Sequence, residues 1–344
     1  MQLTHDVLSS HLFEGHSILS YGAVLKLKLA LKPSLRFRNL VQLSPFHSQV
    51  VLKSKQLSED IVLDKFNALR NDYRMPQYPI VLCHGFFGFD QLLILPNPST
   101  VKRKLLSWFG YEQPQGKSDV QYAAEDYKLW EYFKGVGKEL RARGLTVLIA
   151  RVPPFGTVEE RAQVLNGFIT ANLGEGTKVN LIAHSMGGLD CRYLISRVED
   201  KKFEVASLTT VSTPHHGSSI ADIIVQNVPL PKVPGNTIYQ LSQEYCDTEF
   251  NPETPDDPRV LYFSYGSRCK PSWTNPFYYP WKLLKQKEGP NDGMVSCQSA
   301  RWGQYMGTIE NVDHLELLNW KVKEDFNAMA LYLEIMDTLN KKGL

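Results

Sequence analysis

From Pro79 onward, short apolar runs alternate with longer segments in which apolar residues recur every three or four positions. Apolar runs of roughly four to eight residues, bounded by glycine, proline or polar residues, are typical of buried parallel strands. These runs predict strands over residues 79–83, 145–150, 179–183, 205–211 and 259–265. The alternation predicts an α/β fold, with a mostly parallel central sheet and helices on both faces.

The segments with helical spacing predict helices over residues 125–143, 157–173, 187–198, 220–228 and 325–341. Thr157 and Glu160 stand three residues apart at the start of the second of these, which is the pattern of a capping box. Ser58–Arg70 predicts a further short helix, capped by Ser58. The irregular residues 97–122 are basic and partly aromatic; solvated surface is the default interpretation, and a loop over the site or a surface that meets a membrane are the alternatives. The aromatic and proline-rich stretch Trp273–Trp281 is interpreted as a surface or cap loop.

The N-terminal part of the chain differs from the rest in composition. Acidic residues occur at Asp6 and Glu14, and seven lysines and arginines precede the next one, Glu59. A basic, acid-poor N-terminus is typical of a mitochondrial transit segment. We therefore expect a basic leader over residues 1–75, with mitochondrial targeting, followed by an α/β domain over residues 76–344. The alternative is a basic leader that carries no targeting signal.

Composition excludes several other classes of protein. The 344 residues are 43% hydrophobic, which is enough for a sizeable core, and the formal net charge of +2 gives no reason to expect a nucleic-acid partner. An uninterrupted apolar run long enough for a membrane-spanning helix does not occur. The five cysteines show no CxxC spacing, so reduced thiols are the simplest interpretation, although Cys246 and Cys297 remain a possible pair.

The candidate chemistry begins with the sequence IAHSMGGLD, in which Ser185 stands between a predicted strand and a predicted helix. A nucleophile elbow needs this strand–turn–helix context, with small residues on both sides of the serine. Gly187 fits that pattern, and Ala183 replaces the glycine that usually stands two residues before the serine. The alternative is a serine that merely caps the following helix.

A second glycine-containing loop follows the first predicted strand, in the sequence CHGFFGFD. In α/β-hydrolases the corresponding loop supplies one backbone N–H of the oxyanion hole, and the residue after the nucleophile supplies the other. These donors would be Phe86 and Met186. An ordinary glycine-rich turn is the alternative for the first of them.

A serine hydroxyl needs a base, and the base needs an acid that orients it. His314 lies late in the chain before a helix, and Asp292 lies in a glycine-flanked turn. The order Ser185, Asp292, His314 is the order of α/β-hydrolases. Asp292 could otherwise be a simple turn residue, and Asp313 competes as the acid, although it adjoins His314.

Two adjacent histidines, His215 and His216, raise the question of a metal site. Adjacent side chains rarely face one ion, and a second cluster of ligands is missing, so we assign them to a polar loop and predict no metal. Residues 218–240 follow, with a short apolar helix and three prolines. They stand where an α/β-hydrolase accepts an insertion, which makes them the candidate lid.

Taken together, the motifs resemble those of the fungal mitochondrial-type triacylglycerol lipases, which are similar to the bacterial family-I true lipases. The resemblance runs from about Tyr78 to the C-terminus and is carried by CHGFFGFD, IAHSMGGLDCRYLIS, SLTTVSTPHHGSSIAD, YFSYG, GPNDGMVS and DHLELLNWK. It implies an α/β-hydrolase fold with a short lid, in which Ser185 is the nucleophile, Asp292 the acid and His314 the base.

The chain departs from that family at two further positions. The segment after Ser219 is shorter than the lid of the bacterial relatives, which makes strong interfacial activation doubtful. Those relatives bind calcium through an aspartate two residues after the histidine and a second aspartate before the acid. Here Glu316 occupies the first position, and a convincing partner is missing between Arg268 and Glu288. We therefore expect no calcium site.

These features predict serine-dependent hydrolysis of lipid esters, with triacylglycerol as the expected substrate and fatty acid released through an acyl-enzyme. No cofactor is required. The expected partners are acylglycerol or other acyl lipids and the surface of a membrane or lipid droplet. A phospholipase, a GPI-type deacylase and a lipid acyltransferase share the fold and remain alternatives, because specificity lies in pocket shape. A non-catalytic lipid-binding protein would be expected to have lost the triad.

Overall fold

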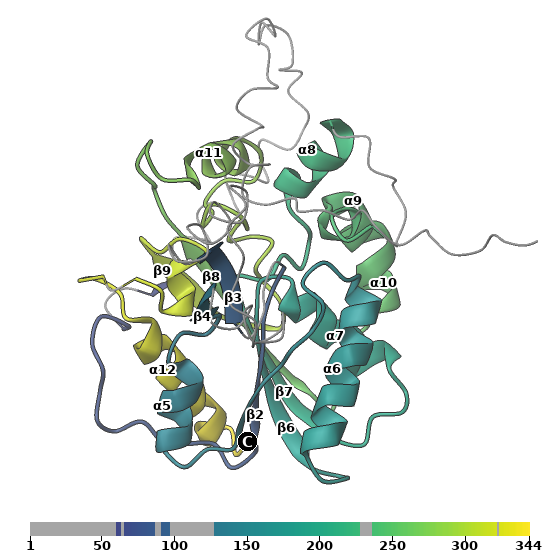
Figure 1. Cartoon of the computed structure of the whole chain (residues 1–344). Coiled ribbons are helices and arrows are strands. Elements are labelled where there is room, and N and C mark those ends of the chain that lie inside the picture. The colour runs from purple at the N-terminus through teal and green to yellow at the C-terminus, as the bar shows by residue number, and fades with distance from the viewer. Residues whose placement is uncertain (1–59, 63–64, 87–90, 97–126, 228–235, 322) are drawn as a thin grey trace, which may run out of the picture. The chain divides into compact units, whose positions relative to one another are not determined.

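The computed structural model describes residues 60–62, 65–86, 91–96, 127–227, 236–321 and 323–344 (Figure 1). For residues 91–96 and 127–130 it describes the backbone alone. All described residues belong to one unit, Ser54–Leu344. The first 59 residues of the expected leader and the irregular segment 97–122 therefore lie outside the described residues.

Seven parallel strands form the central sheet, in the order β1-β9-β8-β7-β6-β2-β5. They are β1 (Ile61–Val62), β2 (Ile80–Cys83), β5 (Val147–Ile149), β6 (Lys178–His184), β7 (Glu204–Val211), β8 (Leu261–Arg268) and β9 (Gln304–Glu310). All four residues of β2 are buried, as expected for a strand covered on both faces. The predicted α/β architecture is confirmed.

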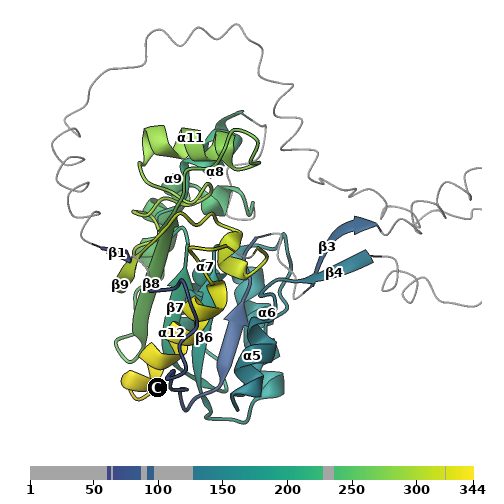
Figure 2. The same cartoon turned by 90° about the vertical axis from the view of Figure 1, so that its left-hand side faces the viewer.

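Helices cover both faces of this sheet (Figure 1). α5 (Val136–Ala142) and α12 (Ala328–Lys341) pack on one face, and α6 (Val158–Asn172) and α7 (Gly187–Arg197) pack on the other. α8 (Ser219–Asn227) and α11 (Tyr278–Lys287) lie together beyond one end of the sheet (Figures 1 and 2). Shorter helical segments are η1 (Tyr239–Leu241), α9 (Gln243–Tyr245), η2 (Cys246–Phe250), α10 (Asn251–Glu253) and η3 (Glu316–Leu318).

The start of α6 shows how local sequence fixes an element. The Glu160 N–H donates to Thr157 Oγ1 (3.2 Å), and the Thr157 N–H donates to Glu160 Oε2 (3.0 Å). This is the reciprocal capping box that the sequence predicts. It satisfies two backbone donors that have no partner within the helix, so α6 begins at a defined residue.

The prediction of a helix over Ser58–Arg70 is wrong. Ile61 and Val62 instead form β1 and pair in parallel with Thr308 and Ile309 of β9. The Asn327 N–H then donates to the Phe66 carbonyl (2.7 Å), which ties the segment to the start of α12. Pairing with a sheet edge has overridden a weak helical period here.

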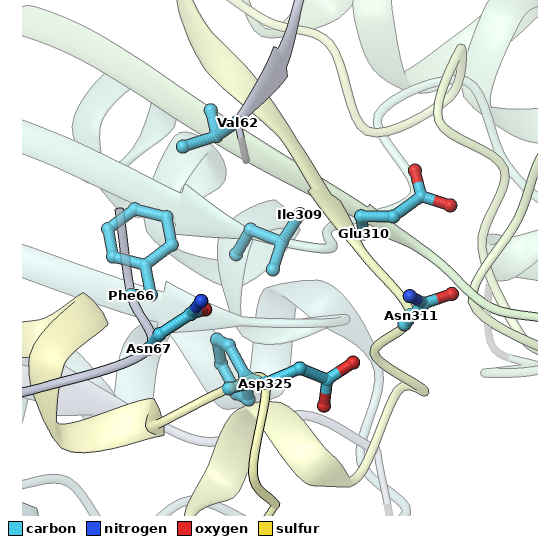
Figure 3. Close-up of a pocket in the computed structure, with 8 residues that line it drawn as sticks. Val62, Phe66, Asn67, Ile309, Glu310, Asn311 and Asp325 are labelled. Carbon is cyan, nitrogen blue, oxygen red and sulfur yellow. The ribbon is translucent and has the colours of Figure 1, made fainter. Parts of the chain in front are cut away.

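The boundary between leader and main domain also needs correction. Phe66 is 2% exposed and packs edge-on against Tyr265 of the core. Val62, Phe66 and Ile309 line one small pocket together with Asp325, at the junction of this segment with β9 (Figure 3). The α/β domain therefore begins by Ile61 rather than at residue 76.

The prediction of one helix over residues 125–143 is correct only for its second half. Tyr127–Glu131 forms strand β4, which pairs antiparallel with β3 (Gln91–Pro96) in a separate two-stranded sheet. Gly135 has a φ of 73°, a left-handed conformation that glycine adopts at little cost and that separates β4 from α5. The predicted loop Trp273–Trp281 likewise ends in a helix, because α11 begins at Tyr278.

Within the described part of the chain, no helix combines the length and the apolar character needed to cross a bilayer.

The contribution of the N-terminal segment can be measured by truncating Phe66. We expect Phe66→Ala to lower the free energy of unfolding by about 3 to 5 kcal/mol, because it removes a large buried aromatic side chain. Leu69→Ala, three residues away at a side chain that is 48% exposed, serves as the control and should change stability by less than about 0.5 kcal/mol. Urea unfolding curves measure the free energy of unfolding of both variants. An effect of Phe66→Ala as small as that of Leu69→Ala would mean that the segment does not belong to the folded domain.

Candidate active site

Ser185 lies at the turn between β6 and α7, as the elbow motif predicts. Its φ is 55°, a conformation that costs a non-glycine residue on the order of 1 to 2 kcal/mol. The turn is held on both sides: the Ser185 N–H donates to the Val211 carbonyl (3.0 Å), and Thr213 Oγ1 donates to the Ser185 carbonyl (2.7 Å). The surrounding strands therefore maintain a strained backbone that projects the serine from the end of the sheet.

Close approach of β2 explains the glycine that follows the serine. A Cβ atom on Gly187 would lie 2.7 Å from the carbonyl oxygens of Cys83 and His84. Such contact with backbone atoms leaves no room for a side chain. Ala183, by contrast, is completely buried without disturbing the turn, so the methyl group that departs from the usual motif is accommodated.

His314 and Asp292 form the pair that the sequence predicts. His314 Nδ1 and Asp292 Oδ2 are 2.7 Å apart, and the His314 N–H donates to the Asp292 carbonyl (3.0 Å). The other carboxylate oxygen accepts the N–H groups of Met294 (2.9 Å) and Val295 (2.8 Å). With Nδ1–H donated to the carboxylate, Nε2 of the neutral ring is free of its proton and able to take one from a hydroxyl group.

Asp313, the competing acid, makes different hydrogen bonds. Its Oδ1 accepts the N–H groups of Leu315 (3.1 Å) and Glu316 (3.0 Å) and so caps the turn that leads into η3. Its neighbour His314 bonds to Asp292 instead. The carboxylate that orients the imidazole is therefore the one in the glycine-flanked turn.

The glycine-containing loop after β2 is clamped by Arg161 of α6. Arg161 Nη2 donates to the carbonyls of His84 (2.8 Å) and Gly85 (3.3 Å), and Nη1 donates to the Pro153 carbonyl (2.7 Å). Because a trans peptide is planar, holding the Gly85 carbonyl toward Arg161 directs the following N–H, that of Phe86, to the opposite side. Gly85 itself lies against the elbow, since a Cβ there would be 2.7 Å from Ser185 Cβ.

Asp190 of the elbow helix completes this clamp. Arg161 Nε and Nη2 lie 2.9 and 2.8 Å from Asp190 Oδ2, and both side chains are fully buried. Burial raises the pKa of Asp190 to about 6, and the Arg161 guanidinium opposes that rise. Removing one partner of such a pair leaves an uncompensated buried charge, which typically costs about 3 to 5 kcal/mol.

The second predicted oxyanion donor, Met186, is the N-cap residue of α7. The first backbone N–H groups of a helix have no partner within it, and the helix dipole adds a partial positive charge at this end. A negatively charged oxygen placed between the Phe86 loop and the start of α7 would therefore be stabilised.

A chain of side-chain hydrogen bonds connects the Phe86 loop to the His314 loop. The Gly85 N–H donates to Tyr132 Oη (3.0 Å), which lies 2.7 Å from His184 Nδ1, and His184 Nε2 lies 3.0 Å from the His314 carbonyl. A carbonyl only accepts, so Nε2 carries the His184 proton, and Nδ1 accepts the Tyr132 hydroxyl proton. Burial and the neighbouring His314 hold the pKa of His184 well below its usual value, so the ring is neutral at pH 7.

The sequence analysis assigned no role to Arg161, Asp190, Tyr132 or His184. His184 stands inside the elbow motif, directly before Ser185, and Asp190 is a charged residue in the helix that the motif starts. The place of these two residues in the elbow motif and in its helix was the sequence signal that could have identified them. Nothing in the sequence spacing connects Tyr132 with His184, because their contact depends on the arrangement of β4, β6 and the following loops.

His215 and His216 both contact Trp302, but their polar partners differ. The His215 ring is buried, stacks on Trp302 and has Nε2 3.0 Å from Thr210 Oγ1. His216 Nδ1 lies 2.9 Å from Asp247 Oδ1 at the surface. The two rings therefore do not converge on one ion.

Glu316 stands where the bacterial lipases that the sequence resembles have a calcium ligand. Its carboxylate accepts the Asp313 N–H (2.9 Å) and Lys323 Nζ (3.2 Å), and Lys321 Nζ is 3.8 Å away. Two ammonium groups already balance its charge, so these residues do not fit a calcium ion. Among the described residues, no group of three histidine, cysteine or acidic side chains converges on one point.

Part of the candidate lid lies within the described structure. Residues 219–227 form α8, in which Ile220, Ile223 and Ile224 are half-buried, while residues 228–235 lie outside the described residues. α8 is joined to the acid turn, because Ser218 Oγ donates to the Met294 carbonyl (2.9 Å). The pocket of Figure 3 is not lined by any predicted site residue and is a separate hollow.

Comparison with known proteins adds sequence relatives to this geometry. Triacylglycerol lipase 2 of Saccharomyces cerevisiae is 36% identical over 330 residues, which cover 85% of this chain and all of the relative. A triacylglycerol lipase of Vibrio cholerae is 30% identical over 173 residues, which cover 50% of this chain and 43% of the relative. No protein-family model matches the chain.

Solved structures show the same fold. A metagenomic carboxyl esterase superposes with a TM-score of 0.56 at 17% identity, covering 80% of this chain and 79% of the esterase. The Staphylococcus hyicus lipase superposes with a TM-score of 0.55 at 15% identity, covering 80% of this chain and 99% of the lipase. At these identities the comparison establishes the α/β-hydrolase fold and no more.

The hydrogen-bond chain through Tyr132 makes a prediction about turnover. We expect Tyr132→Phe to lower kcat on a soluble short-chain ester roughly 10- to 100-fold with little change in KM, because both loops lose their shared anchor and shift slightly. Tyr332→Phe is the matched control, because Tyr332 is equally buried and its hydroxyl has no hydrogen-bond partner in the described chain. Steady-state kinetics measure both; a similar kcat for the two variants would contradict a positioning role.

Proposed function

Since the chain belongs to the triacylglycerol lipases, we propose that it releases fatty acids from long-chain acylglycerols with Ser185 as nucleophile, His314 as base and Asp292 as acid. The protein is a serine-dependent hydrolase of lipid esters on an α/β-hydrolase fold. The observation that carries the assignment is the 2.7 Å contact between His314 and Asp292, together with the position of the His314 ring 4.5 Å from the ring of His184, the residue directly before Ser185.

Acylation begins with attack of Ser185 Oγ on the ester carbonyl carbon. His314 Nε2 takes the hydroxyl proton as the bond to carbon forms, which gives a tetrahedral intermediate. When the carbon–oxygen bond of the ester breaks, the same nitrogen gives the proton to the departing diacylglycerol oxygen. The fatty acyl group then remains on Ser185.

Deacylation repeats these steps with water. His314 Nε2 takes a proton from water as the water oxygen attacks the acyl carbon. The bond to Ser185 Oγ breaks, the serine regains a proton from the imidazole, and the fatty acid leaves. No cofactor takes part in either half of the reaction.

We assign the oxyanion hole to the backbone N–H groups of Phe86 and Met186. Loss of one such donor typically costs about 3 kcal/mol of transition-state stabilisation. The Arg161 contacts that orient the Gly85 carbonyl support a preformed hole, because the Phe86 N–H need not turn during the reaction.

Asp292 would hold the imidazole and balance the charge that His314 gains in each tetrahedral intermediate. The two N–H groups that donate to its other oxygen support this role, because they fix the orientation of the carboxylate. Removal of its charge would leave the ring free to adopt the wrong tautomer.

We also propose that the enzyme works in mitochondria, on the composition of its N-terminal residues, which are basic and almost free of acidic residues. A fluorescent protein fused to the C-terminus should co-localise with a mitochondrial marker. The same fusion lacking residues 1–53 should lose that localisation. A full-length fusion found elsewhere would contradict the proposal.

The nucleophile and the base can be tested on emulsified long-chain triacylglycerol. We expect Ser185→Ala and His314→Gln each to lower kcat by at least about 10⁴-fold, and Asp292→Asn by a similar factor, because the three groups act as one unit. Fatty-acid release, with and without chelator, is the measurement. Ser196→Ala, at a half-buried serine near the far end of α7, is the control and should retain most activity.

Three outcomes would change this account. Equal rates for the parent protein and Ser185→Ala would show that the elbow serine is not the nucleophile. Activity confined to soluble short esters or phospholipids would change the substrate while leaving the triad intact. More acyl transfer to an added alcohol than fatty-acid release would make the protein an acyltransferase.

A further inference from the structure

The segment Cys269–Lys287 carries exposed aromatic and basic side chains next to the proposed active site. We propose that this segment docks the enzyme on a phospholipid bilayer that contains anionic lipid. We call it the basic aromatic surface, and its members are Lys270, Trp273, Tyr279, Lys282, Leu283, Lys285 and Lys287. The inference rests on the proposed lipase function, since it assigns a surface from which that site would reach its substrate.

Exposure of large apolar side chains is the first observation. Trp273 is 78% exposed, Tyr279 58% and Leu283 37%. They are three of the seven large apolar side chains that are exposed in the described part of the chain, and they fall within 11 consecutive residues. Tryptophan and tyrosine are the residues favoured at a membrane interface, where an apolar ring and a polar group both find suitable surroundings.

Charge is the second observation. The segment Cys269–Lys287 contains four lysines, all exposed, and no acidic residue. Residues 1–59 contain seven basic and three acidic residues and carry +4, so residues 60–344 carry −2 of the chain's formal net charge of +2. The segment contributes +4 to residues 60–344, and the remainder of those residues carries −6. Within residues 60–344 this surface is therefore a local concentration of positive charge, and it complements a negatively charged lipid bilayer.

Helix α11 holds part of this surface rigidly. Trp281 and Leu284, three residues apart, face inward and are buried. Tyr279 and Leu283, four residues apart, occupy the outer face, with Lys282 beside them. Lysine side chains can extend their charged ends to phosphate groups while their methylene groups cover apolar surface, so this face suits the headgroup region.

The basic aromatic surface is joined to the proposed catalytic groups. A Cβ on Gly293, next to Asp292, would lie 2.8 Å from Phe277 Cβ. Asn275 Nδ2 lies 3.5 Å from Asp313 Oδ2, directly before His314. α11 packs beside α8 beyond the end of the sheet that carries the elbow (Figures 1 and 2). A bilayer on this surface would therefore lie beside the catalytic edge.

Anionic bilayer lipid fits these features better than a neutral lipid droplet or an acidic protein. A neutral surface would offer no opposite charge to the four lysines, whereas each lysine near an anionic membrane strengthens binding about five-fold. An acidic protein would satisfy the lysines but give no reason for an exposed tryptophan beside them. The combination of charges and rings indicates a surface that is both anionic and penetrable.

The test measures vesicle binding of the full chain carrying Ser185→Ala, so that lipid is not consumed. Vesicles of phosphatidylcholine with roughly one-third phosphatidylglycerol are compared with phosphatidylcholine alone. The test variant combines four substitutions, Lys270→Gln, Lys282→Gln, Lys285→Gln and Lys287→Gln. It should bind the anionic vesicles at least about 100-fold more weakly than the parent. Binding should also weaken as salt is added.

A matched control removes four other exposed lysines, with the substitutions Lys134→Gln, Lys138→Gln, Lys202→Gln and Lys342→Gln. It has the same net charge as the test variant and should bind like the parent. Trp273→Ala should weaken binding about ten-fold, and the fluorescence difference between parent and Trp273→Phe should shift to shorter wavelength on vesicles.

Equal binding by the two four-lysine variants would overturn the proposal, as would equal binding of the parent to neutral and anionic vesicles. If binding weakens with salt but the Trp273 fluorescence does not shift, the surface makes charge contact without inserting its ring, as it would with an acidic protein. That result would also overturn the proposal. Hydrolysis of a soluble short ester by the same variants with Ser185 intact should be unchanged. Failure of that reaction in the parent would count against the proposed function and not against docking.

Discussion

The backbone of Ser185 is the constraint on which the rest of the site depends. A non-glycine residue with a φ of 55° persists only where its surroundings hold it, and here they do so on several sides. The Val211 carbonyl and the Thr213 hydroxyl fix the turn from the neighbouring strand, and the β2 carbonyls approach so closely that residue 187 has to be glycine. The parallel sheet therefore supplies both the position of the serine and the free energy that maintains its conformation.

From this turn the site extends through two buried polar networks. Arg161 connects the elbow helix, through Asp190, to the carbonyls of the Phe86 loop. Tyr132 and His184 connect the same loop to the backbone of His314. Hydrogen bonds in a protein interior are electrostatically stronger than in water, so such buried contacts hold their partners firmly. These contacts keep the proposed oxyanion donor and the proposed base in fixed positions relative to the serine.

Sequence analysis predicted the elements whose signals are local. The apolar runs of the inner strands, the Thr157 capping box and the glycines around Ser185 each depend on neighbouring residues. β1 and the strand at residues 127–131 were missed because each is fixed by a distant partner that no local period records. The order of Ser185, Asp292 and His314 pointed to their pairing, but the Arg161 clamp and the Tyr132 connection depend on packing that brings together residues far apart in the sequence.

The central claim is that Ser185 faces a preformed oxyanion hole. The most direct measurement is a crystal structure of the protein after reaction with a long-chain alkylphosphonate, whose phosphorus mimics the tetrahedral carbon of the intermediate. The account predicts a covalent bond from phosphorus to Ser185 Oγ, with a phosphoryl oxygen about 3 Å from the N–H groups of both Phe86 and Met186. Phosphorus attached to another residue, or an oxygen directed away from both N–H groups, would contradict it.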